Sequence, residues 1–206
     1  MILTWANRLT ILRILLIAPF IICMLQVNDV EWSEHLRHII RYCAVAIFFL
    51  MAVSDGIDGY LARKKKQATK LGAFLDPTAD KLLITSACLL LASHHAGVEG
   101  FILPSTVVVL IIGKDVLVFL GFLIIYFLTG KIRTVPAFAG KASTALQLAM
   151  VPAILIAPEV SLYIHGWIYF VYLLWWAAAI AAVIAALVYI RVGSKFIEQY
   201  EQNNNH

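Results

Sequence analysis

Four aspartates lie within 26 consecutive residues of this 206-residue chain, between two strongly apolar segments. Asp55 and Asp58 are three residues apart, so on a helix both side chains project from one face. The same holds for Asp76 and Asp80, which are four residues apart. Gathered carboxylates repel one another and take up protons unless cations keep them ionised. The pattern predicts a site for Mg²⁺ or Mn²⁺, with two ions about 3.5–4 Å apart suited to a phosphoryl-type displacement.

Small and basic residues accompany these carboxylates. Gly56 and Gly59 leave room for a ligand to approach the helix backbone closely. Arg63, one turn beyond Gly59, offers a planar fork that suits a pyrophosphate. Because ionisable groups are costly inside a membrane and usually belong to a functional site, we predict the active site in the hairpin 55–80.

The spacing Asp-x2-Asp-Gly-x2-Ala-Arg-x8-Gly-x3-Asp-x3-Asp resembles the complete signature of the CDP-alcohol phosphotransferase family, with all eight specified residues present. The resemblance implies a polytopic, homodimeric membrane enzyme that moves a phosphatidyl group from CDP-diacylglycerol to an alcohol and releases CMP. It implies that Asp55, Asp58 and Asp76 bind the metal. It implies two roles for Asp80, as a metal ligand and as the general base on the acceptor hydroxyl. The implied nucleotide site is lined by Thr10, Gly59, Ala62, Arg63 and Gly72.

A second motif lies near the N-terminus. The segment from Asn7 to Arg13 (NRLTILR) resembles the Asn-x-Leu-Thr-x-x-Arg motif of the same family. The resemblance implies that Thr10 contacts the nucleotide, with Asn7 as the second candidate. The segment is also amphipathic, which predicts an interfacial stretch leading into a retained first span rather than a signal peptide. An interfacial anchor without a further role also explains this pattern.

Composition independently predicts an all-α polytopic membrane protein. Hydrophobic residues make up 62% of the chain and charged residues 14%, and the mean hydropathy is +0.89. Since about 20 apolar residues cross a bilayer, we predict one domain, 1–206, with a flexible polar tail at 197–206. We expect a lipid bilayer and no nucleic acid as partner. The six predicted transmembrane helices lie near residues 8–26, 39–62, 72–93, 103–129, 141–157 and 162–191.

The basic residues predict the orientation of these spans. Lys and Arg gather in the connections 63–71 and 130–140, whereas the connections 27–38, 94–102 and 158–161 are mainly acidic. The positive-inside rule therefore predicts that both termini and the hairpin 55–80 are cytoplasmic. Without an obvious transit peptide, a bacterial plasma membrane is the expected location.

Two further places bear on the acceptor. Lys114 and Asp115 are adjacent charges within the fourth span, which need partners on other helices or a wet cavity. A structural ion pair across the bundle and a place for Lys114 in the acceptor pocket explain them equally well. The stretch from Gly140 to Gln147 resembles the Gly-Lys-x-x-Thr-x2-Gln element of family members that form glycerophosphate lipids or cardiolipin. The resemblance implies that Lys141 and Thr144 contact an anionic phosphate; helix capping with a cytoplasmic charge is the alternative.

The resemblance favours glycerol 3-phosphate as the acceptor. A C-terminal Tyr189-x3-Gly193-x-Lys195 pattern also resembles the cardiolipin synthases of the family, which use phosphatidylglycerol. A divalent-cation carrier is the alternative from another class, with the four aspartates as its transport site. Their clustering near one edge of the membrane disfavours a carrier, because a carrier needs paths to both sides.

Overall fold

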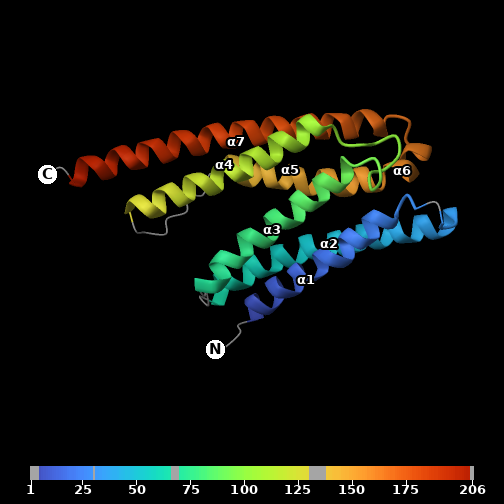
Figure 1. Cartoon of the computed structure of the whole chain (residues 1–206), viewed down its shortest axis with the longest axis horizontal. Coiled ribbons are helices and arrows are strands. Elements are labelled where there is room, and N and C mark those ends of the chain that lie inside the picture. Colours follow the sequence, from blue (N-terminus) through green and yellow to red (C-terminus); the bar gives the residue numbers. More distant parts are fainter. Residues whose placement is uncertain (1–4, 30, 66–69, 130–137, 205–206) are drawn as a thin grey trace. The chain divides into compact units, whose positions relative to one another are not determined.

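The computed structural model describes residues 5–29, 31–65, 70–129 and 138–204. Within these ranges the regular structure is entirely helical and contains no strand, which confirms the predicted all-α class. Figure 1 shows the helices in chain order. They are α1 (Trp5–Gln26), α2 (Glu34–Lys65), α3 (Lys70–Leu91), α4 (Ser105–Thr129), α5 (Phe138–Leu155), α6 (Ala157–Tyr163) and α7 (Trp167–Asn204).

Four stretches of the described ranges are long and apolar enough to cross a membrane. They are Glu34–Ser54 in α2, Ser105–Ile125 in α4, Phe138–Leu155 in α5 and Trp167–Lys195 in α7. The apolar part of α1, Thr10–Gln26, is shorter. Length and composition therefore identify an integral membrane protein with at least these four candidate spans.

The largest differences from the predicted boundaries lie in the last third of the chain. Residues 158–161, expected as a connection, belong to α6, since Pro158 in the first turn and Glu159 beside it both favour a helix start. Helix α7 begins at Trp167 and continues to Asn204, so the segment expected as a polar tail is helical through that residue. With 38 residues, α7 is about 57 Å long, well beyond the thickness of a bilayer core.

The chain divides into two compact units. The first unit combines Met1–Leu103 with Val151–Val171, and the second combines Pro104–Met150 with Tyr172–His206. In the first unit, α1 packs against both α2 and α3 (Figure 1). This arrangement lets side chains of α1 meet those of the helical hairpin made by α2 and α3.

Helix α1 buries one stripe of residues at alternating steps of three and four, as expected for a helix packed on neighbours. The stripe contains Thr10, Arg13, Ile17, Phe20 and Met24, and the buried Val27 follows directly after the helix. Phe20 meets Phe48 of α2 with ring centroids 5.8 Å apart. Leu12, Leu15 and Ile22 on the other side are exposed. Apolar residues therefore lie on both the buried and the exposed side of α1, and its two polar stripe residues, Thr10 and Arg13, face inward.

Helices α2 and α3 bury matching stripes. The stripe of α2 contains Ala44, Phe48 and Met51, and that of α3 contains Ala79, Leu83, Ile84, Ala87 and Leu91. The alanines permit close approach of helix backbones, which is the usual way for membrane helices to associate. Both stripes run along their helices toward the hairpin 55–80.

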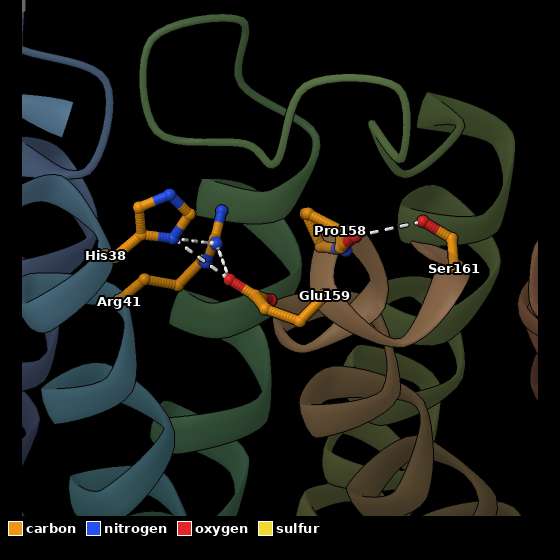
Figure 2. A network of polar contacts seen from close by, with 5 residues as sticks. All are labelled: His38, Arg41, Pro158, Glu159 and Ser161. Atoms are coloured by element: carbon orange, nitrogen blue, oxygen red, sulfur yellow. Dashed lines mark hydrogen bonds and ion pairs between the residues drawn. The ribbon is translucent and has the colours of Figure 1, made fainter. Parts of the chain in front are cut away.

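Polar contacts join α2 to α6 within the first unit. Arg41 donates through Nη2 to Oε1 of Glu159, and the same carboxylate oxygen lies 3.1 Å from Nδ1 of His38. Figure 2 shows these side chains converging, with the Ser161 hydroxyl donating to the carbonyl of Pro158 nearby at 3.0 Å. These contacts tie the start of the α2 span to α6, more than 100 residues later in the chain.

A tight contact also closes the loop after α3. The Asn28 side chain donates to the carbonyl of Gly97 at 2.6 Å. A Cβ on Gly97 would lie 2.5 Å from the carbonyl oxygen of Ser93, so only glycine fits at this position. The connection between α1 and α2 is therefore fastened to the connection between α3 and α4.

In the second unit, α7 buries a small-residue face and exposes a large one. The buried face includes Ala178, Ala179, Ala182 and Ala185. The exposed side chains include Trp176, Ile180, Ile184 and Leu187. Exposed bulky apolar residues opposite a face of alanines are typical of a membrane helix that packs closely on one side and contacts lipid on the other.

Candidate functional site

An ion pair between α1 and α3 marks the polar end of the first unit. Nη1 of Arg13 donates to Oδ1 of Asp80 at 3.0 Å. The Arg13 side chain is 1% exposed, whereas the Asp80 side chain is 29% exposed. The carboxylate is therefore held from the inside of the bundle and remains accessible from outside it.

Thr10 lies one helical turn before Arg13 and is fully buried on the same face of α1. The predicted polar face of the N-terminal segment thus turns toward the neighbouring helices, because Arg13 finds a carboxylate there and not in solvent. The segment is the first part of α1 and is continuous with the remainder of that helix. For Thr10 and Arg13, an interfacial anchor is not a sufficient explanation.

The backbone of α2 and α3 carries the other predicted members of the site. Asp55, Asp58, Gly59, Ala62 and Arg63 belong to the C-terminal part of α2. Gly72 and Asp76 belong to the first turns of α3. The side chains of these seven residues lie outside the described part of the chain, so their roles stay predictions.

The donor set suits the expected metal. Carboxylate oxygens are hard ligands of the kind that Mg²⁺ and Mn²⁺ prefer. Of the four aspartates, Asp80 has a described side chain. The Arg13 guanidinium contacts one of its carboxylate oxygens and balances its charge. Among the described side chains no group of three His, Cys, Asp or Glu residues lies close enough to hold a metal ion. The predicted metal site includes three aspartates whose side chains lie outside the described part, so it stays a prediction.

Lys114 and Asp115 of α4 pair with each other in the second unit. Nζ of Lys114 lies 3.0 Å from Oδ1 of Asp115, and the two side chains are 3% and 9% exposed. This contact joins two adjacent residues of one helix, whereas the predicted ion pair was one across the bundle.

The element from Gly140 to Gln147 forms the first turns of α5. Lys141 is exposed, and the Thr144 hydroxyl donates to the carbonyl of Gly140 at 3.1 Å. Ser143 and Gln147 are fully buried, with the Gln147 amide donating to the Ser143 hydroxyl at 3.0 Å. Lys141 is thus available to a ligand, while the hydroxyl hydrogen of Thr144 is engaged with its own helix.

Two residues of interest were not assigned from the sequence. Arg13 was part of the quoted N-terminal motif, and its place three residues after Thr10 on the polar face was the signal that could have identified it. Tyr189 of α7 lies against Gly140, where an added Cβ would come within 2.6 Å of its hydroxyl. No pattern in the sequence links these two positions, because the contact joins helices almost 50 residues apart.

Comparison with known proteins gives consistent matches. The family model for CDP-alcohol phosphatidyltransferase matches residues 3–184. A relative from Pseudomonas fluorescens is 40% identical over 112 residues, which are 54% of this chain and 51% of the relative. A relative from Haemophilus influenzae is 42% identical over 87 residues, 42% of each chain. A relative from Bacillus subtilis is 32% identical over 153 residues, covering 73% of this chain and 75% of the relative.

All three relatives are named CDP-diacylglycerol–glycerol-3-phosphate 3-phosphatidyltransferase. The matched region spans about half of the length of the first two relatives, and three quarters of the Bacillus protein. The family model covers most of the present chain, including the signature from Asp55 to Asp80 and the N-terminal motif. The chain belongs to the CDP-alcohol phosphatidyltransferase family.

Proposed function

We propose that this protein is a phospholipid-synthesis enzyme that transfers the phosphatidyl group of CDP-diacylglycerol to an alcohol and releases CMP. The observation that carries the proposal is the Asp80 carboxylate, the last residue of the family signature, bound at 3.0 Å by a buried arginine of α1 and still partly exposed. A carboxylate held in this way at the end of an apolar helix bundle suits a reacting group better than a packing residue.

The reaction is a displacement at phosphorus. The acceptor hydroxyl oxygen attacks the phosphorus that carries diacylglycerol, and the bond from that phosphorus to the bridging oxygen breaks. CMP leaves with the bridging oxygen, and Asp80 accepts the hydroxyl proton. Because a carboxylate close to cations is a weak base, Asp80 depends on its position beside the hydroxyl more than on its basicity.

The other residues of the site hold the donor substrate. Asp55, Asp58 and Asp76, with Asp80, are the proposed ligands of two divalent ions, Mg²⁺ or Mn²⁺. Such ions, when bound, supply charge neutralisation for a diphosphate. Thr10, Gly59, Ala62, Arg63 and Gly72 are the proposed nucleotide contacts.

Helix register supports this assignment. Asp55 follows the buried Met51 of α2 by four residues, and Asp58 follows it by seven, so both continue the register of the buried stripe. Asp76 and Asp80 precede the buried Ile84 of α3 by eight and four residues. By helix register, the four aspartate positions therefore continue the helix faces on which the buried apolar residues of α2 and α3 lie.

Glycerol 3-phosphate is the proposed acceptor, which would make the product phosphatidylglycerophosphate. The names of all three relatives support it. Lys141, exposed at the start of α5, is the proposed contact to the acceptor phosphate, together with the helix N-terminus and Thr144. Lys114 is the weaker candidate, since its ammonium group is paired with Asp115.

We also propose six membrane spans, formed by α1 to α5 and α7, with both termini and the site in the cytoplasm. The lengths of α1 and α3, 22 residues each, are sufficient for a crossing. The basic residues Arg63, Lys64 and Lys65 in the last turn of α2 support a cytoplasmic hairpin. A homodimer in a bacterial plasma membrane completes the proposal, by likeness to the family.

CMP release by the detergent-purified protein tests the function. CDP-diacylglycerol is supplied with Mg²⁺ or Mn²⁺, and glycerol 3-phosphate, phosphatidylglycerol, serine and inositol phosphate are offered separately. We expect release with glycerol 3-phosphate, loss of release with EDTA, and recovery when the metal is restored. The Asp55→Asn variant is the matched negative control.

Release with phosphatidylglycerol alone would make the protein a cardiolipin synthase and would overturn the acceptor assignment. Absence of release with every acceptor, combined with an Asp55-dependent Mn²⁺ flux into liposomes, would overturn the enzyme assignment in favour of a carrier. Both measurements use the full-length chain.

A further inference from the structure

Among the described side chains of the first unit, Arg13 is the largest polar one that is almost completely buried. Its side chain is 1% exposed, in the middle of a stripe that continues with Ile17, Phe20 and Met24. An arginine at such a position is costly unless a carboxylate and hydrogen bonds compensate for the lost hydration. An apolar side chain at position 13 could be buried at a lower free-energy cost, so packing alone does not account for Arg13.

One contact of Arg13 is with an atom of the proposed site. Its Nη1 lies 3.0 Å from Oδ1 of Asp80, a distance typical of a strong charge-assisted hydrogen bond. Guanidinium is planar and stays charged at any pH relevant to a cell, so it fixes the rotation of a carboxylate more firmly than an ammonium group does. The partly exposed Asp80 is thereby held by a buried side chain.

We propose that Arg13 is a positioning residue, which holds the Asp80 carboxylate in the orientation needed to accept the proton of the acceptor hydroxyl. This inference rests on the proposed function of Asp80. Arg13 itself touches neither substrate; it acts through Asp80, by fixing its rotamer and by balancing its charge from the inner side of the bundle. The apolar stripe, rather than this ion pair, holds α1 against α2 and α3.

Two substitutions separate positioning from packing. Arg13→Met keeps the length of the side chain and removes the charge and the hydrogen bonds, whereas Arg13→Lys keeps the charge and loses the fork. Ile17→Ala, one turn further along the same stripe, is the matched control for packing. Each variant is measured for kcat, for KM of CDP-diacylglycerol, for thermal unfolding in detergent and for Mn²⁺ binding by electron paramagnetic resonance.

We expect Arg13→Met to lower kcat about 100-fold, as a misplaced catalytic group does, with KM for CDP-diacylglycerol changed less than about threefold. Arg13→Lys recovers part of kcat. Mn²⁺ binds to Arg13→Met at least as tightly as to the unchanged protein, because a competing cation is gone; Asp80→Asn weakens Mn²⁺ binding. Ile17→Ala lowers the unfolding temperature and keeps kcat per folded molecule.

Retention of kcat within about threefold in Arg13→Met would overturn the proposal, as would an equal loss of kcat in Ile17→Ala. Weaker Mn²⁺ binding in Arg13→Met would also overturn it, since that outcome means a general collapse of the site. If the unchanged protein releases no CMP with any acceptor, the proposed function fails and the role of Arg13 fails with it. If the unchanged protein is active and only the Arg13 variants depart from the expected kinetics, the proposed role of Arg13 fails and the proposed function stands.

Discussion

The Tyr189 hydroxyl of α7 lies over Gly140 of α5, so closely that a Cβ on Gly140 would come within 2.6 Å of the hydroxyl oxygen and 3.1 Å of the ring. A larger residue at this position would therefore force the Tyr189 side chain to move. The contact connects the start of α5, where the proposed acceptor contacts lie, to the C-terminal half of the longest helix in the described part of the chain.

Gly140→Ala should destabilise the protein by about 1–3 kcal/mol, because the added methyl group forces the tyrosine ring away. Thermal unfolding in detergent measures the effect. Adding Tyr189→Phe, which removes the closest atom, should recover part of the loss, so the two changes are not additive. Gly193→Ala is the matched control, since a Cβ there meets nothing within 4 Å; equal destabilisation by both glycine substitutions would contradict the steric explanation.

The ion pair between Arg41 and Glu159 should contribute to stability and not to catalysis. Arg41→Met leaves the largely buried Glu159 carboxylate without its cation, which should cost about 1–3 kcal/mol of the free energy of unfolding. His38→Ala should cost less, because the His38 side chain is 52% exposed. Both variants should release CMP at the normal rate per folded molecule, and a selective loss of turnover would show that this network reaches the reaction.

Asp80→Asn should abolish turnover while the protein still binds CDP-diacylglycerol. The amide keeps the size of the side chain and cannot accept the hydroxyl proton. Competition binding with a labelled CDP-lipid, measured beside CMP release, separates the two effects. Glu159→Gln is a suitable control for loss of a partly buried carboxylate elsewhere in the same unit. Normal turnover in Asp80→Asn would refute the general-base assignment.

Lys114 and Asp115 should behave as a structural pair. Lys114→Met should destabilise the protein, because Asp115 loses the ammonium group 3.0 Å away. The double change Lys114→Met with Asp115→Leu should be more stable than Lys114→Met, since it replaces both charges by apolar groups. KM for glycerol 3-phosphate should stay unchanged in the double variant. A large increase in that KM would instead place Lys114 in the acceptor pocket.

The helical fold was predictable from the sequence, because long apolar stretches of about 20 residues have few alternatives in a membrane. The bounds of α1, α3, α4 and α5 fall within three residues of those predicted. The short helix α6 was not predicted, since seven residues with one proline carry too weak a periodic signal. The end of α7 was placed too early, because its polar last turns lie beyond the apolar stretch that the prediction relied on.

The candidate site was only partly predictable. Spacing predicts a site at the four aspartates, and the structure describes the side chain of one of them, Asp80, which contacts Arg13. The burial of Arg13 was not predictable, because its segment has the pattern of an interfacial helix. Its partner, Asp80, belongs to α3 and lies 67 residues later in the chain. Likewise, the expectation of an ion pair across the bundle did not predict that Lys114 and Asp115 contact each other at 3.0 Å.

The 67 residues between Arg13 and Asp80 also bear on how the chain is made. At about 5–20 residues per second, a ribosome takes about 3 to 13 seconds to synthesise the carboxylate after the arginine has emerged. On insertion scales a charged residue costs up to about 2.5–3.5 kcal/mol, the value at the centre of a helix, and during this interval Asp80 does not yet exist to offset the cost of Arg13. We therefore expect α1 to stay near the membrane surface or the insertion machinery until α3 has been synthesised.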